Sequence, residues 1–186
     1  MVGPTDGNEH TEDSDHPDLA NAAGEMRAEW RAEQDAATAD AAAQWRHGRG
    51  IADWLRDCMH AGDRIAVSVA DREFVGLVDE VGADLVAVRG QFGRVEIHMC
   101  AGVPLSFAIV EHAREGGTRA TATRGFRDAL LAHDGQTGVR VGTVQCPEGI
   151  EGTLLVGRDL VSVVTSVGTE TIVPIAHVAW VRPAPA

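Results

Sequence analysis

Four side chains of the kinds that bind zinc lie in two short pairs. Cys58 and His60 come at the end of a predicted helix, and His98 and Cys100 lie on a predicted strand. A zinc site would require all four to converge, yet the CxxC and HxxxH spacings typical of structural zinc sites do not occur in the sequence. These residues are therefore interpreted as two small buried thiols, a helix-end histidine and a surface histidine. The sequence predicts no metal and no other cofactor.

Side chains suited to acid–base or nucleophilic catalysis are not grouped in this sequence. Asp79 and Glu80 are adjacent on a predicted strand, where neighbouring side chains point to opposite faces, so they would form a poor acid–base pair. Three serines on predicted strands lack the nucleophile-elbow motif, namely Ser68, Ser106 and Ser162. The sequence therefore predicts a protein that is not an enzyme.

The most basic stretch is the predicted linker 111–124 together with the start of the helix that follows. Arg119, Arg124 and Arg127 are the residues that would contact phosphate groups there. Two interpretations remain open: a nucleic-acid contact, or a solvated Gly- and Thr-containing linker that leads into a helix. The linker has no aromatic residue on which bases could stack. The whole chain has a net charge of -12, whereas nucleic-acid binders usually present a basic face, so a nucleic-acid partner is not favoured.

The elements that position these residues occur twice in the chain. The stretch FVGLVDEVGADLVAVRGQFGRVEIHMCAGV, at 74–103, returns as IEGTLLVGRDLVSVVTSVGTETIVPIAHV, at 150–178. Gly76 matches Gly152 at an offset of 76 residues; one residue then drops out, and later positions match at an offset of 75. The later pairs include Gly82 with Gly157, Val86 with Val161 and Ile97 with Ile172. Self-similarity of this kind indicates a duplicated structural unit.

Each copy is predicted to be a short helix followed by five short strands. Apolar residues at helical spacing predict helices over 51–60 and 126–134. Runs rich in Val, Ile and Leu, separated by turns with Gly or Asp, predict strands over 63–69, 73–81, 84–90, 94–100 and 103–109, and over 138–145, 149–156, 159–166, 169–175 and 177–182. Gly76 and Gly152 lie inside strands, where glycine usually marks a bulge or a sharp bend. Such bends close five short strands into a barrel.

The N-terminal part has a different character. Residues 1–16 hold almost no apolar and no basic side chain, which predicts a disordered acidic tail. From Pro17, a residue suited to the first helical position, an Ala-rich helical arm is predicted over 17–50. Trp30 and Trp45 are the largest members of its narrow apolar stripe. A helix with so thin a stripe is weakly held alone, so both are predicted to pack on another copy, a partner protein or the barrels of this chain.

A short helix followed by five bent antiparallel strands resembles the Sm-like small barrel, within the wider SH3-like group. In the first copy the likeness is carried by Trp54, Leu55, Gly62, Arg64, Ile65, Phe74, Gly76, Gly82, Asp84, Leu85 and Ile97. The chain also resembles uncharacterised actinobacterial proteins in which a helical N-terminal arm precedes two such barrels. The resemblance implies a mainly β protein with two tandem five-stranded barrels, each preceded by a short helix, over 51–110 and 125–186. The RNA-binding loop residues of Sm proteins, an Asp with an Asn and a later Arg-Gly, are incomplete here.

Composition sets the remaining expectations. No apolar run is long enough to span a membrane, and the acidic first residues lack the apolar core of a signal peptide. Three cysteines without a CxxC pair argue against a disulfide framework, so a cytoplasmic location is predicted. The predicted function is a non-enzymatic interaction or assembly module that binds a protein partner, or another copy, through the N-terminal helix and the barrel edges. The alternative is a nucleic-acid-binding regulatory protein that uses the arginine-containing linker and the barrel loops.

Overall fold

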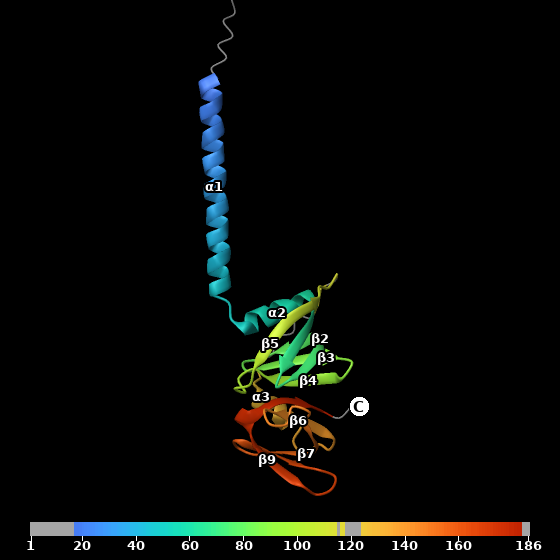
Figure 1. The fold of residues 1–186 in the computed structure, drawn as a ribbon. Helices are drawn as coiled ribbons and strands as arrows, with labels where there is room; N and C mark the ends of the chain where they lie inside the picture. The colour runs from blue at the N-terminus through green and yellow to red at the C-terminus, as the bar shows by residue number, and fades with distance from the viewer. Residues whose placement is uncertain (1–16, 115, 118–123, 184–186) are drawn as a thin grey trace, which may run out of the picture. The chain divides into compact units, whose positions relative to one another are not determined.

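The computed structural model in Figure 1 describes residues 17–114, 116–117 and 124–183. The predicted tail, 1–16, and Arg119 lie outside these residues. The chain divides into two compact units, Met1–Arg49 and Gly50–Ala186.

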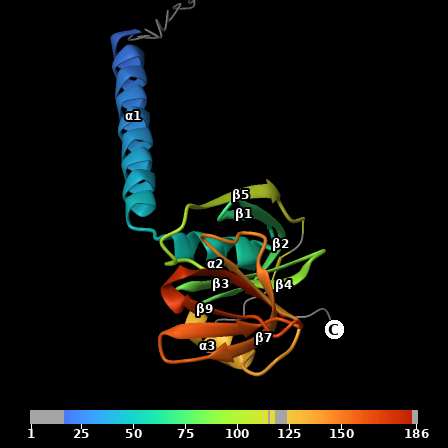
Figure 2. The same cartoon turned by 60° about the horizontal axis from the view of Figure 1, so that its bottom comes forward.

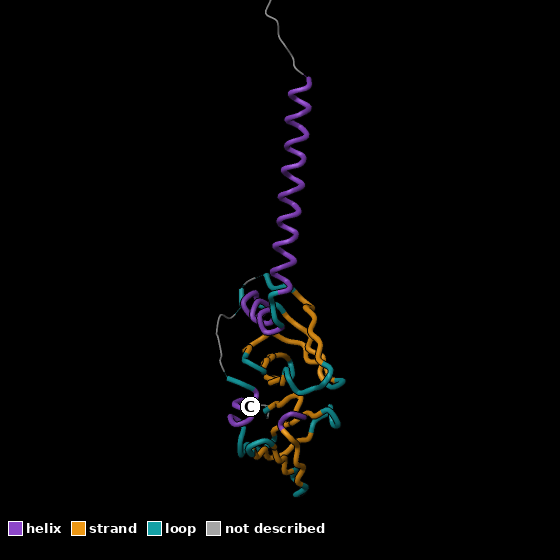
Figure 3. Tube along the Cα trace, turned by 90° about the vertical axis from the view of Figure 1, so that its left-hand side faces the viewer, coloured by secondary structure: helices purple, strands orange, loops and turns teal. Residues whose placement is uncertain are grey.

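The first unit contains one long helix, α1 (Pro17–His47), which Figure 3 shows as continuous. It begins at Pro17, as the sequence predicts, because proline already has the backbone angle of a first helical residue. The side chains of Trp30 and Trp45 are 60% and 61% exposed. The guanidinium carbon of Arg49 lies 4.0 Å from the centre of the Trp45 ring, in a cation–π contact.

Within the described part of the chain, no helix combines the length and the apolarity that crossing a membrane requires.

The second unit begins with helix α2 (Ile51–Ala61), which contacts the first group of strands. The backbone N–H of Gly50 donates to a carboxylate oxygen of Asp53 at 3.2 Å and so fixes the start of the helix. The helix ends at Gly62, whose φ of 81° lies in the left-handed region that glycine adopts most readily. The side chains that α2 buries are Leu55, Cys58 and Met59. The predicted amphipathic helix over 51–60 is therefore confirmed.

All ten predicted strands are present, each with ends within two residues of the prediction. They are β1 (Arg64–Val69), β2 (Arg72–Val81), β3 (Leu85–Gly90), β4 (Gly93–His98), β5 (Leu105–Glu111), β6 (Val139–Thr143), β7 (Ile150–Val156), β8 (Leu160–Val164), β9 (Glu170–Pro174) and β10 (Val178–Arg182). A short 3₁₀ helix, η1 (Ile175–His177), connects β9 to β10. The strands form one antiparallel sheet in the order β5-β1-β2-β3-β4-β10-β6-β7-β8-β9.

The strand order is the same in both halves of this sheet. The first half runs β5-β1-β2-β3-β4 and the second β10-β6-β7-β8-β9, so β10 takes the place of β5. Helix α3 (Phe126–Ala132) precedes β6 as α2 precedes β1. The predicted division into two tandem five-stranded barrels is not confirmed, because β4 pairs with β10 and joins all ten strands in one sheet that does not close. In Figure 1 the halves are green to yellow and orange to red, and in Figure 2 the red C-terminal strand lies beside the green ones.

The residue that drops out between the repeats forms a β-bulge. Between Val78 and Glu80 the pairing of β2 with β3 shifts, which leaves Asp79 as the extra residue. The equivalent strands β7 and β8 pair without a shift. The change of offset from 76 to 75 residues in the sequence therefore marks the loss of this bulge in the second half.

The predicted match of Ile97 with Ile172 is wrong by one residue. Ile97 pairs with Val86 on β3, and Val173 pairs with the equivalent Val161 on β8. Ile97 and Val173 are both buried, whereas Ile172 is 62% exposed. The turn between β8 and β9 is longer than the turn between β3 and β4, which moves the register of β9. Ile97 is thus equivalent to Val173, and Glu96 to Ile172.

Gly76 and Gly152 are explained by close contact between strands. A Cβ atom on Gly76 would lie 2.3 Å from the carbonyl oxygen of Arg89, and one on Gly152 would lie 2.4 Å from that of Val164. Any side chain at either position would collide with the neighbouring strand. The sequence predicts a bulge or a sharp bend at both glycines, but the strand pairing shows no register shift at either position, and the glycines instead allow the neighbouring strand to approach closely.

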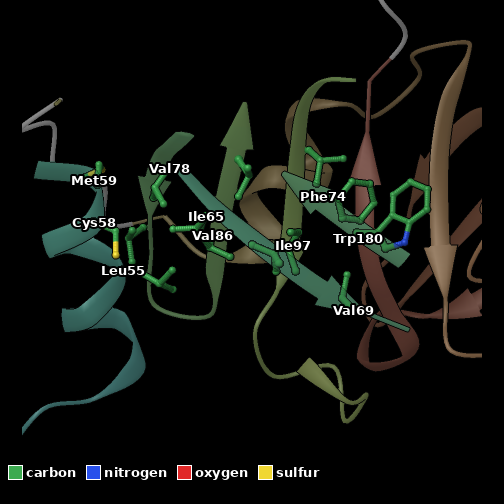
Figure 4. Close-up of a cluster of buried hydrophobic side chains, with 14 of the residues drawn as sticks. Leu55, Cys58, Met59, Ile65, Val69, Phe74, Val78, Val86, Ile97 and Trp180 are labelled. Carbon is green, nitrogen blue, oxygen red and sulfur yellow. The ribbon is translucent and has the colours of Figure 1, made fainter. Parts of the chain in front are cut away.

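Each half of the sheet has its own apolar core. The first core combines α2 with β1–β4 and also takes in Ala179 and Trp180 from β10. Figure 4 shows this cluster, with Leu55 and Cys58 at one end and Trp180 at the other. The second core combines α3 with strands of the second half. Val86 and Val161, predicted to be equivalent core positions, are both fully buried.

Candidate functional site

The predicted site residues do not come together in one place. Trp30 and Trp45 are exposed on α1. Arg124 and Arg127 lie in the second unit, at the start of the second repeat, and Arg119 is outside the described residues. Arg127 is exposed and donates to the backbone carbonyls of Gly157 and Arg158, each at 3.2 Å.

Arg124 belongs to a partly buried ionic cluster where the two repeats meet. Its guanidinium donates to Glu80 at 2.6 and 2.8 Å and to Glu96 at 2.6 Å. The side chain of Glu96 is only 2% exposed and also accepts hydrogen bonds from Arg94, at 3.2 and 3.3 Å. Its other carboxylate oxygen lies 2.9 Å from Nε2 of His133, which follows α3. The cluster therefore ties β2 and β4 of the first repeat to the segment around α3.

The charges of this cluster set the protonation of its carboxylates. Burial by itself would raise the pKa of Glu96, but the hydrogen bond and charge of His133 and the charge of Arg124 outweigh burial and lower that pKa to about 2. The hydrogen bond from Arg124 is the main cause that lowers the pKa of Glu80. The bond to Glu80 in turn raises the pKa of Arg124. Both carboxylates are thus ionised at neutral pH and serve as fixed anions.

The expectation that Asp79 and Glu80 point to opposite faces is wrong at this site. The bulge at Asp79 interrupts the alternation of β2, so both carboxylates bond to the guanidinium of Arg94. Asp79 also accepts hydrogen bonds from Arg89, at 2.9 and 3.0 Å. With an arginine on each carboxylate, the pair acts as part of an ion-pair network.

The residues considered for zinc lie in different parts of the structure. Cys58 lies in the first core, as predicted, whereas the prediction of a buried thiol is wrong for Cys100, which is exposed. His98, predicted to lie on the surface, is only 7% exposed. Its ring stacks on Phe126 of α3 with 4.5 Å between ring centres, and its Nδ1 lies 3.1 Å from the carbonyl oxygen of Val178. In the described ranges, no three or more His, Cys, Asp or Glu residues are grouped so as to hold a metal ion.

Trp180 forms the apolar part of the contact between the repeats. It pairs with Ile97 across β10 and β4, and its ring meets that of Phe74 edge to face, with 5.3 Å between centres. The indole also lies over Gly142, where a Cβ atom would be 2.0 Å from the ring. Trp180 is 1% exposed. The second repeat therefore places a large aromatic side chain in the core of the first.

Among the strands that the structure describes, two edges of the sheet are unpaired, and these are the strongest candidates for a binding surface. Strand β5 ends the sheet on the first half and β9 ends it on the second. Each carries an exposed apolar side chain: Val110 on β5 is 52% exposed, and Ile172 on β9 is 62% exposed. Edge strands offer free backbone N–H and C=O groups to another strand.

A pocket of about 630 Å³ lies along β9. Its walls come from β9 and η1, from the end of β6 through the β6–β7 loop to the start of β7, and from the loop that follows β4. The lining of this β9 pocket includes Thr143, Ile150, Ile172, Val173 and Ala176. Its volume is within the range of pockets that bind small molecules or single large side chains.

Sequence reasoning missed Glu96, His133 and Trp180. A signal was present in the comparison of the repeats, because Glu96 corresponds to Ile172 once the register is corrected. A charged residue in one copy and an apolar residue in the other indicate different surroundings: β4 is covered by β10, whereas β9 is a free edge. The match of the two repeats at an offset of 75 residues made Ile172 the equivalent of Ile97 and so concealed this difference.

Comparisons of the chain with protein-family models, with curated proteins and with solved structures gave no match.

Proposed function

We propose that this chain is a non-enzymatic interaction or assembly module built from two Sm-like small barrels, with β1–β5 in one and β6–β10 in the other. Its unpaired edges, β5 and β9, bind the strands of partners. The observation that carries this proposal is the pairing of β10 with β4, because the chain joins its own two halves by this kind of strand-to-strand contact.

The two free edges correspond to the two strands, β4 and β10, that pair with each other inside the sheet. In the order of the sheet, β9 occupies the position in the second half that β4 occupies in the first, and β5 corresponds to β10. Since β4 pairs with β10, β9 of one copy can pair with β5 of the next in a head-to-tail contact. The exposed Trp30 and Trp45 on α1 provide a second apolar surface for a partner.

The alternative, a nucleic-acid-binding regulator, has less support. Arg124 is committed to Glu80 and Glu96, and Arg127 to two backbone carbonyls. Phosphate binding would have to replace these contacts, and the net charge of -12 opposes the approach of a nucleic acid.

Light scattering over a series of protein concentrations tests the use of the edges. The double variant Val110→Lys/Ile172→Lys places a charge on each edge, a device that natural edge strands use against pairing. We expect the mean mass of the parent to rise with concentration and that of the double variant to rise clearly less, with an unchanged melting temperature. Val167→Lys, at an 84% exposed position between β8 and β9, is the control. Equal masses for parent and double variant would refute edge pairing.

A further inference from the structure

The contact made by Trp180 on the first half has an unfilled counterpart on the second half. Trp180 pairs with Ile97 and packs against Phe74. The residue equivalent to Ile97 is Val173, because both are paired with equivalent valines on the preceding strand. The residue equivalent to Phe74 is Ile150, since each lies two positions before the matching glycine of its repeat.

Both counterparts line the β9 pocket. Ile150 and Val173 form part of its wall, together with Thr143, which ends β6 as Val69 ends β1. Val69, Phe74 and Ile97 belong to the core cluster that contains Trp180. The β9 pocket is therefore the place where a side chain equivalent to Trp180 would lie, and the strand that would carry this side chain would pair with the free edge of β9.

No described strand of the chain that is free to pair would fill this pocket, although β5 of another copy can pair with the edge of β9. The position on β5 equivalent to Trp180 is Ser106, because Ser106 pairs with Ser68 on β1 as Trp180 pairs with Gly142 on β6. A serine would leave the pocket unfilled. The aromatic residue of β5, Phe107, already packs on Trp54 of its own half, with 6.2 Å between ring centres. Strand β10 is paired on both sides and cannot be offered to another copy without opening the sheet.

We infer that the β9 pocket receives an aromatic side chain from an extended strand that a different polypeptide adds to β9; this inference rests on the proposed function of the edges. The aromatic residue lies opposite Val173, as Trp180 lies opposite Ile97. The indole nitrogen of Trp180 is buried without a hydrogen-bond partner, so the equivalent contact requires apolar shape rather than a polar group. A phenylalanine or a tryptophan in an extended apolar segment satisfies this requirement.

Titration of the full chain with peptides, followed by calorimetry, tests the inference. The probe is AHVAWVRP, the sequence of residues 176–183, which contains β10. The matched control peptide carries Ser in place of the Trp, and a third peptide, VPLSFAIVE, is the sequence of residues 103–111 with β5. We expect the Trp peptide to bind at least about tenfold more tightly than either of the other two, because only it fills the pocket.

A variant of the protein locates the binding site. Ala176→Trp, at an exposed position of the pocket wall, fills the pocket from the chain itself and should abolish binding of the Trp peptide. Ala132→Trp, at an exposed position of α3 outside the pocket wall, should leave binding unchanged. Melting temperatures show whether both variants keep their fold, and the peptide comparison on the unmodified chain is independent of them.

The possible results separate this inference from the proposed function. Equal binding of the Trp and Ser peptides would overturn the inference but leave edge pairing intact. Equal or tighter binding of the 103–111 peptide would overturn it in favour of a second copy as the occupant. Binding of no peptide would also overturn it, and the light-scattering series would then decide separately whether the edges pair at all.

Discussion

Glu96 shows how this protein stabilises a buried charge. Its carboxylate is almost completely removed from solvent, and Arg94, Arg124 and His133 all bond to it. Buried ion pairs often contribute little net stability relative to apolar residues of the same size, but removal of one partner is costly, because the remaining charge is then unpaired. The cluster therefore serves chiefly to fix how the segment around α3 sits on β4.

The depressed pKa of Glu96 predicts how stability depends on pH. The pKa is about 2 in the folded chain, against 4.5 for an unperturbed Glu, so the unfolded chain binds the proton more readily. The stability that this group contributes is fully present above pH 4.5 and is lost as the pH falls through about 2. In Glu96→Gln this part of the acid-induced loss should disappear, and stability at neutral pH should fall by about 3 kcal/mol.

Urea unfolding, followed by tryptophan fluorescence at a series of pH values, measures this effect. Glu151→Gln is the control, because Glu151 forms an exposed pair with Arg140 outside the cluster. Its unfolding free energy should stay within about 0.5 kcal/mol of the parent, as is typical of a surface change. If parent and Glu96→Gln lose stability in parallel below pH 4.5, another carboxylate determines the acid response.

At the scale of elements, each half of the sheet depends on its own core. Val86 on β3 and Val161 on β8 are fully buried, and each pairs with a buried residue of the next strand. Val86→Asp and Val161→Asp should each lower the free energy of unfolding by about 4 kcal/mol, since either change buries an unpaired charge. Thermal and urea unfolding of both variants measure the loss.

The control for these core variants is Val167→Asp, at a position that is 84% exposed in the turn between β8 and β9. It should melt close to the parent, because its carboxylate remains in water. Two Asp core variants that melt like this control would show that Val86 and Val161 are not the equivalent core positions of a duplicated unit.

Local patterns in the sequence predict the elements well, and the failures are non-local. The helix starts at Pro17 and Ile51 and all ten strands follow from residue spacing, because these depend on neighbours along the chain. The pairing of β10 with β4 does not follow from local spacing, since it joins segments about 80 residues apart. The buried environment of Glu96 depends on that same pairing, so no local pattern in the sequence predicts that Glu96 is buried.

The corrections at single residues have similar causes. The alternation rule fails at Asp79 because a bulge inserts one residue into β2. The match of Ile97 with Ile172 fails because the turn before β9 is longer, although the sequence around the turn still aligns. In each case one extra residue, within β2 or in the turn before β9, changes which side chains lie on the same face of the sheet.

At the scale of the whole molecule, the chain combines two units with different sources of stability. The second unit has two apolar cores and a ten-stranded sheet. In the first unit, the described side chains of α1 are nearly all exposed. Most of the stability of a helix comes from the packing of an apolar face, and propensity alone gives little. We therefore propose that α1 provides a surface for assembly through the exposed Trp30 and Trp45.

The double variant Trp30→Ala/Trp45→Ala tests this use of α1. Each tryptophan contributes roughly 2–3 kcal/mol when buried, so loss of both should remove any assembly that depends on the helix. We expect a lower mean mass in light scattering than for the parent, with the melting temperature of the strand-rich unit unchanged. Gln34→Ala/Gln44→Ala, at two exposed positions of the same helix, is the control and should keep the mass of the parent.

Each outcome assigns α1 a different role. An unchanged mass with a lower melting temperature would mean that α1 stabilises the fold of the chain itself, and the assembly role would be wrong. An unchanged mass with an unchanged melting temperature would mean that the isolated protein does not assemble through this helix, which removes that support for self-association. Only a lower mass with an intact melting transition supports α1 as a contact between copies, because the tryptophans then matter for association and not for folding.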